Sequence, residues 1–135
     1  MIGGPINQVA AAAVATSESL GVSSYTDLTT PGPAVTIVVP ASGIVKVSLS
    51  VTSSGSATNT QQRMSVALSG GNTVAASDNY ACTDYTGIIN NLTTKSIVFG
   101  ITGLAAGSTT FTCKYSSTTG TSTFQNRWIV VEGLP

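Results

Sequence analysis

The chain has 135 residues, enough for one domain with a hydrophobic core of its own. Only 7% of the residues are charged, and five Lys and Arg balance five Asp and Glu. The sequence therefore lacks the basic surface that a nucleic acid or an anionic membrane would require. It contains no His, which removes the most common general base and the catalytic triads built on it. We expect no enzymatic activity and no cofactor.

The first 20 residues differ from the rest of the chain. They are rich in Ala, Val and Ser and show no clear alternation. They contain no Lys or Arg, so they do not match a signal peptide, and their longest apolar run, Val9–Ala15, is too short for a membrane span. We interpret residues 1–20 as an extended docking arm that becomes ordered against a neighbour. The expected apolar contacts of this arm are Ile2, Ile6, Val9 and Val14. Deletion of residues 2–18 is then expected to leave the remaining domain folded and to abolish attachment.

Residues 21–135 show the pattern of an all-β domain. Alternation is clearest in Ile44–Thr52, Arg63–Ser69, Ser96–Thr102 and Thr109–Tyr115. Further strands are expected at Ser24–Leu28, Ala34–Val39, Thr73–Ser77, Tyr80–Thr83 and Thr123–Glu132. Eight or so short strands, separated by Gly, Pro, Asn and Ser, predict an antiparallel β-sandwich. Both a jelly-roll and an immunoglobulin-like topology are compatible with the pattern.

The residues that could bind a metal ion are few. Asp78, Asn79 and Asp84 could offer oxygen ligands to Ca²⁺, but their spacing matches no calcium loop, and Asp and Asn also form turns. Two Cys and no His do not complete a zinc site. We predict no metal site. For Cys82 and Cys113 we favour buried, reduced thiols, although a disulfide is compatible with the sequence.

Aromatic and basic residues supply the remaining candidates for binding. Four tyrosines could stack on sugar rings or could anchor a core or an interface: Tyr25, Tyr80, Tyr85 and Tyr115. Arg63 and Arg127 each lie among apolar strand residues. We expect each to pair with a carboxylate across strands or at an interface, because the guanidinium fork matches that group.

Several segments together resemble a known family. They are Ser24–Leu28, Pro31–Thr36, Arg63–Gly70, Ala75–Asn79, Thr102–Tyr115 and Gly120–Arg127. This series resembles a domain of actinobacterial-phage virion proteins, notably the C-terminal part of minor tail and tail-fibre proteins. The resemblance covers roughly residues 15–131 and is most specific over Gly103–Tyr115 and Thr123–Val131. It implies a β-sandwich displayed on a virion, often as a trimer, without catalysis.

The absence of a shaft or stalk before the module favours a capsid decoration protein on the head surface over a tail component. The alternative is a minor tail or tail-tip module that binds a receptor or a cell-surface glycan. The expected location is the virion, assembled in the host cytoplasm, with the major capsid protein or other virion proteins as partners. Several strands are apolar on both faces, including Ile37–Val39, Ile97–Phe99 and Trp128–Val131. Because one sandwich core covers only one face, we expect a homotrimer or another closed homo-oligomer.

Overall fold

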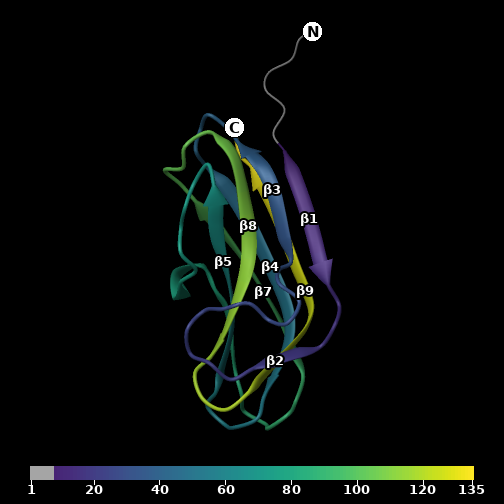
Figure 1. The fold of residues 1–135 in the computed structure, drawn as a ribbon. Helices are drawn as coiled ribbons and strands as arrows, with labels where there is room; N and C mark the ends of the chain where they lie inside the picture. Colours follow the sequence, from purple (N-terminus) through teal and green to yellow (C-terminus); the bar gives the residue numbers. More distant parts are fainter. Residues whose placement is uncertain (1–7) are drawn as a thin grey trace.

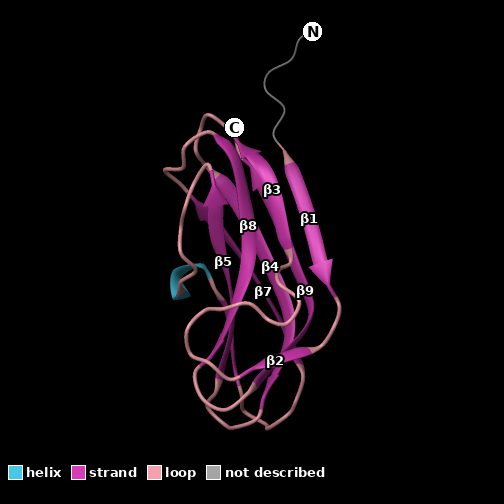
Figure 2. Ribbon diagram, in the orientation of Figure 1, coloured by secondary structure: helices cyan, strands magenta, loops and turns pink. Residues whose placement is uncertain are grey.

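A computed structural model describes residues 8–135, which fold into two antiparallel sheets packed face to face (Figures 1 and 2). The first sheet has the order β1-β9-β4-β7 and contains β1 (Val9–Val14), β9 (Ser122–Gly133), β4 (Val45–Gly55) and β7 (Thr93–Ile101), with β2 (Glu18–Leu20) also paired to β9. The second has the order β3-β8-β5-β6 and contains β3 (Ala34–Val39), β8 (Gly107–Ser117), β5 (Gln61–Gly70) and β6 (Cys82–Tyr85). The predicted β-sandwich is confirmed.

The strand pairs are nested along the chain. β5 pairs with β6, β4 with β7, β3 with β8, and β1 with β9, all antiparallel. The chain is thus one long hairpin, closed between β5 and β6, whose two arms run together and are rolled into two sheets. This is the jelly-roll arrangement of eight strands, with β2 as a short addition. Of the two topologies compatible with the sequence, the structure selects the jelly roll.

Alternating side chains form the core between the sheets. Along β3 every second residue is buried, and β4 keeps one face buried over most of its length. The largest fully buried apolar side chains are Tyr115, Phe111, Phe124, Ile37, Leu49, Met64 and Ile129. The Tyr115 and Phe124 rings lie 5.0 Å apart and join the two sheets. Burial of this alternating set is the main driving force for the fold.

Three expected strands differ from the structure. Ser24–Leu28 makes only an isolated bridge, from Thr26 to Tyr115. Thr73–Ser77 contributes one bridge, between Val74 and Leu68. The strand expected at Tyr80–Thr83 instead begins at Cys82, after a 3-10 turn at Asp78–Tyr80. The first two segments therefore pair at a single position each, whereas the third forms β6, which pairs with β5 but begins two residues later than expected.

The boundary at residue 20 does not coincide with the edge of the sandwich. Val9–Val14 and Glu18–Leu20, placed in the docking arm by the sequence, pair with β9 inside the first sheet. The run of alanines conceals the alternation, because small side chains suit both the inner and the outer face of a sheet. Ile2 and Ile6 lie outside the described residues. None of the helices in the described chain is long and apolar enough to cross a membrane.

A bulge in β9 sets the direction of its side chains. Ser50 lies opposite Trp128, whereas Thr52 lies opposite Gln125, so β9 carries one more residue than β4 at this point. Asn126 adopts a left-handed conformation there, with φ of 49°. The extra residue reverses the alternation, so Arg127 points into the interior and Trp128 points out, half exposed.

The buried Arg127 guanidinium connects β9 to the first third of the chain. Its side chain is fully buried, and Nη2 donates to Glu18 Oε1 at 2.9 Å. Nη1 donates to the carbonyl oxygens of Gly32 at 3.2 Å and Thr30 at 3.3 Å. The guanidinium carbon lies 5.2 Å from the Tyr115 ring centroid. The expected pairing of Arg127 with a carboxylate is confirmed, and the partner is Glu18.

Loss of Glu18 should therefore be costly. Glu18→Ala leaves the buried Arg127 charge without its counter-ion, and we expect a loss of about 3 kcal/mol in the free energy of unfolding measured in urea. Asp27→Ala is the matched control, because Asp27 pairs with Lys114 at 2.7 Å on a partly exposed surface. That change should cost less than about 1 kcal/mol. Equal losses in the two variants would contradict the role of the buried pair.

The same pair predicts a dependence of stability on pH. The Thr30 hydroxyl, which donates to Glu18 at 2.7 Å, and the nearby Arg127 lower the pKa of Glu18 below its ordinary value of 4.5. A carboxyl group with a lowered pKa stabilises the fold above its unfolded pKa, and this contribution is lost as the pH falls below 4.5. The difference in Tm between wild type and Glu18→Gln should shrink between about pH 6 and about pH 3. A difference that grows toward low pH would contradict this assignment.

Candidate functional site

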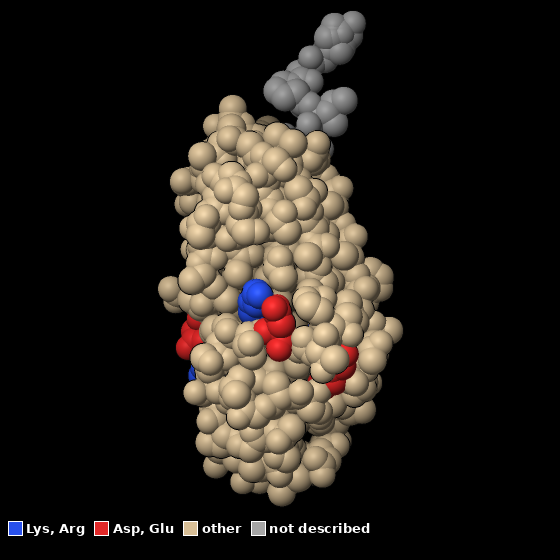
Figure 3. Space-filling view, in the orientation of Figure 1, with Lys and Arg blue, Asp and Glu red and all other residues tan. Residues whose placement is uncertain are grey.

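Opposite charges are matched within the chain. Arg63 pairs with Asp78, Lys95 with Asp84, Lys114 with Asp27, and Arg127 with Glu18, at N–O distances between 2.7 and 3.9 Å. The fifth pair, Lys46 and Glu132, lies side by side on β4 and β9. Figure 3 shows the consequence on one face: the few charged atoms lie in its lower half, and the rest is uncharged. Eight of the ten charges are paired in this way, and Lys46 and Glu132 carry opposite signs on neighbouring strands, so no patch of one sign forms on the described residues.

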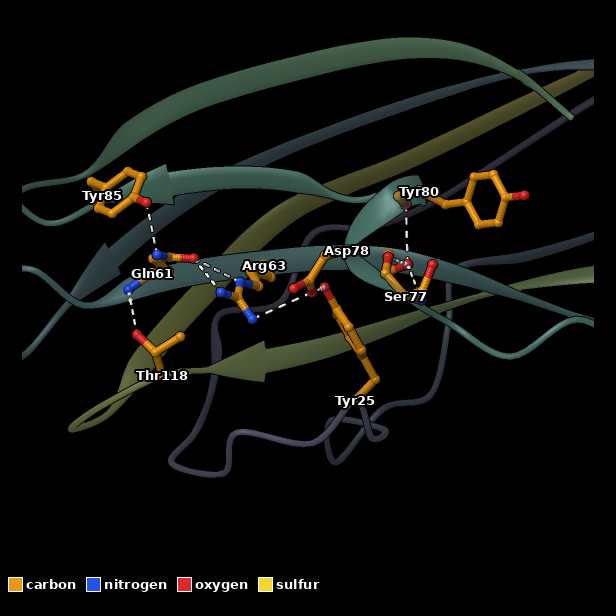
Figure 4. Close-up of polar contacts among 9 residues, drawn as sticks. Tyr25, Gln61, Arg63, Ser77, Asp78, Tyr80, Tyr85 and Thr118 are labelled. Atoms are coloured by element: carbon orange, nitrogen blue, oxygen red, sulfur yellow. Dashed lines mark hydrogen bonds and ion pairs between the residues drawn. The ribbon is translucent and has the colours of Figure 1, made fainter.

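A row of polar side chains crosses the outside of the second sheet (Figure 4). Gln61 Nε2 donates to Tyr85 Oη at 2.7 Å, and Arg63 Nε donates to Gln61 Oε1 at 2.9 Å. Arg63 Nη1 reaches Asp78 at 3.3 Å, and the Tyr25 hydroxyl donates to the same carboxylate oxygen at 2.6 Å. We call these five residues the polar strip. The expected carboxylate partner of Arg63 is confirmed as Asp78.

The polar strip offers groups that could bind a ligand. Burial, and then the hydrogen bond to Asp78, raise the pKa of Tyr25 far above its ordinary value, so the hydroxyl stays protonated. Asp78 is held by Arg63 and Tyr25. Tyr85 is 62% exposed at one end of the strip and offers an aromatic face beside the Gln61 amide. Such a face can stack on a flat, partly apolar ligand.

The other tyrosines have structural positions. Tyr115 is fully buried, and its hydroxyl donates to the Gly32 carbonyl at 2.8 Å. Tyr80 stacks on Phe99, with ring centroids 5.5 Å apart, and so packs the 3-10 turn against β7. Of the four tyrosines considered for sugar stacking, the structure brings only Tyr25 and Tyr85 into the polar strip.

The residues considered for metal binding are separated. Asp78 belongs to the polar strip, whereas Asp84 accepts hydrogen bonds from the Thr93 hydroxyl and the Tyr85 N–H. Among residues 8–135, no three His, Cys, Asp or Glu side chains form a cluster that could hold a metal ion. Cys82 and Cys113 are buried and unpaired, on β6 and β8, with β5 between these strands. Burial raises the pKa of the Cys82 thiol to about 11, so it is unreactive near neutral pH.

One end of the sandwich carries exposed aliphatic side chains. Ile88 is 72% exposed, and Ile89 and Leu92 are each 50% exposed, all in the loop from β6 to β7. The loop is held in place, because Asn90 N–H donates to the Gly55 carbonyl at 2.9 Å. Thr86, just before the loop, also packs closely against Gly55. A Cβ at Gly55 would collide with the Thr86 side chain, so only glycine fits at this position. We call Ile88, Ile89 and Leu92 the apolar tip.

The apolar tip lies far from the C-terminus. Asn90, in the loop that carries the tip, donates to Gly55, the last residue of β4. Leu134 N–H donates to Ile44, just before the first residue of β4. Figure 1 shows the corresponding loops at the bottom of the view and the C-terminus at the top. Sequence reasoning missed the apolar tip because its residues show no strand or helix periodicity and lie in a loop beside Gly87, Asn90 and Asn91. A run of large aliphatic residues inside a turn was the available signal.

A second surface with exposed apolar side chains lies on the outside of the first sheet, where Lys46 and Glu132 are the charged neighbours. Trp128 is 50% exposed and Val98 is 60% exposed, with Val130 partly covered. In the adjacent β1, Val9 is 62% exposed, whereas Val14 is only partly exposed and opposite Arg127. Of the four predicted arm contacts, the structure therefore describes two and places them on opposite faces of an edge strand.

Comparison with known proteins gives a fold and no family. No protein-family model matches the sequence, and no characterised protein matches it. Three structures from infectious bursal disease virus share the fold, each with a TM-score of 0.59 over 94% of this chain: the Gx strain at 11% identity, the VP2 subviral particle at 12%, and virus-derived T=1 particles at 13%. The match covers between 31% and 33% of the viral chains, so this chain spans about a third of their length. At these identities the likeness establishes the fold alone.

Proposed function

We propose that this chain is a non-enzymatic structural protein of a bacteriophage virion, and that it decorates the outside of the head by binding the major capsid protein. The proposal rests first on the apolar tip, where Ile88, Ile89 and Leu92 stay exposed on a loop that the sandwich holds in place. Exposed apolar groups that are concentrated in this way are characteristic of protein contact surfaces.

Two further observations support a role in a particle. The sandwich shares its fold with chains of the VP2 subviral particle and of virus-derived T=1 particles. The segments from Gly103 to Tyr115 and from Thr123 to Val131 resemble phage virion domains. The ion pairs within the chain leave no patch of positive charge for nucleic acid, which fits a partner that is a protein.

The location of the protein tests the proposal, and the apolar tip provides a variant. Mass spectrometry of separated heads and tails should find the chain with the heads.

The double variant Ile88→Ser and Ile89→Ser should bind particles that lack the protein more weakly, with at least a tenfold loss of occupancy at limiting concentration. The control Val38→Ser and Val98→Ser removes two valines that are 50% and 60% exposed elsewhere. Recovery with tails alone, or equal loss in both double variants, would contradict the proposal.

We propose a shorter docking arm, residues 2–7, because Val9–Val14 and Glu18–Leu20 pair with β9. Deletion of residues 2–18 would remove β1 and Glu18, so this truncation is now expected to destabilise the sandwich. Deletion of residues 2–7 removes Ile2 and Ile6 and leaves each described strand intact. We expect the shorter deletion to preserve the Tm and to lower attachment to particles. Normal occupancy of the shortened protein would show that Ile2 and Ile6 make no contact with the shell.

The polar strip favours a second function, recognition of a cell-surface glycan by a tail-tip module. Tyr85 offers an exposed ring, and Gln61, Arg63 and Asp78 carry polar groups beside it. Recovery with tails, together with binding to host cells that Tyr85→Ala abolishes, would select this function over decoration. In either role we propose a closed homo-oligomer; the family resemblance implies three copies, whereas the unprotected edge of β1 favours two-fold pairing.

A further inference from the structure

The four sheet edges of the described chain are protected to different degrees. β6 has only four residues and includes Asp84, and β7 carries Lys95. On β3 the Val38 N–H donates to the Gln8 side chain at 2.7 Å. β1, by contrast, reads Val-Ala-Ala-Ala-Ala-Val, without a charge, a proline or a register shift against β9. Edge strands of monomeric proteins usually carry one of these devices, because unpaired backbone groups invite another strand.

The backbone groups at the free edge of β1 follow from the pairing with β9. Gly133 N–H donates to the Gln8 carbonyl at 2.9 Å, so this opposed pair is hydrogen bonded. Hydrogen-bonded and non-hydrogen-bonded pairs alternate along an antiparallel ladder. The N–H and C=O groups of Val9, Ala11 and Ala13 therefore point away from β9, and within residues 8–135 no hydrogen bond to another segment occupies them.

These free groups are self-complementary. If two β1 strands lie antiparallel with Ala11 opposite Ala11, then Val9 of each copy lies opposite Ala13 of the other. All three opposed pairs then have their N–H and C=O groups facing the partner, which gives six hydrogen bonds. The side chains of the same three residues are exposed on the outer face of the sheet, so the pairing also keeps outward side chains on one face.

We propose that β1 pairs antiparallel with β1 of a second copy across a two-fold axis at Ala11, which joins two β1-β9-β4-β7 sheets into one continuous sheet. The occupant is a second copy because the pattern of donors and acceptors matches itself and the strand carries no charge that would repel its own kind. The exposed Trp128 lies opposite Ala13, beside the joint, so the two outer faces with their exposed apolar side chains become continuous as well. This inference goes beyond the virion role and does not depend on it.

Single cysteines test the register. Opposed residues in a hydrogen-bonded antiparallel pair have Cα atoms about 5.5 Å apart, within the range for a disulfide. Ala11→Cys should therefore form a covalent dimer on mild oxidation. Ala13→Cys is the matched control: four residues of offset place its two copies about 13 Å apart, too far to bond. A mixture of Val9→Cys and Ala13→Cys should cross-link, whereas each alone should not. The native thiols are buried and do not compete.

Charge reversal at the axis provides a second measurement. Ala11→Lys and Ala11→Glu place like charges opposite each other, so each alone should sediment as a monomer of about 13.5 kDa, and their mixture should sediment at twice that mass. Ser48→Lys, on the central strand β4 of the same face, should remain dimeric. A wild-type monomer at high micromolar concentration, a trimeric mass, or equal cross-linking of Ala11→Cys and Ala13→Cys would overturn the proposal.

Discussion

The bulge at Asn126 turns the Arg127 guanidinium into the interior, and this buried charge fixes the N-terminal part of the described chain against β9. A charge in the interior requires an opposite charge and hydrogen-bond acceptors, because it has lost its hydration. Arg127 donates hydrogen bonds to the Glu18 carboxylate and to the carbonyl oxygens of Thr30 and Gly32. Segments that have little alternation of their own are thereby fixed against β9, and the first third of the chain becomes part of the sandwich.

The same bulge determines which surface faces outward. One inserted residue reverses the alternation of β9, so the large Trp128 ring leaves the interior and lies next to the small residues of β1. A chain with matched charges then presents hydroxyls, small side chains and a few large apolar groups. Surfaces of this kind favour contacts between proteins, because water gains entropy when apolar area is covered and no ion has to be desolvated.

The three candidate contact surfaces occupy different parts of the molecule, which allows them to bind different partners. The apolar tip lies at the far end of β4 from the C-terminus, whereas the β1 edge lies along the side of the first sheet. A copy paired through β1 keeps its apolar tip free for a shell. The polar strip lies outside the second sheet, so neither contact covers it. Self-association, attachment and ligand recognition are therefore geometrically compatible in one small domain.

The sequence by itself determined the fold class and the central strands, because alternation in Ala34–Val39, Arg63–Ser69 and Thr109–Tyr115 reflects one buried face. It also indicated that both arginines need carboxylates, since a guanidinium among apolar residues has to be paired. Only the tertiary structure decided that β1 is a strand, because four alanines fit either face of a sheet. The partner of Arg127 lies 109 positions away, and no local pattern connects residues at that separation. The jelly-roll order was likewise decided in three dimensions, because the hydrophobic pattern records burial of a strand and not its neighbours.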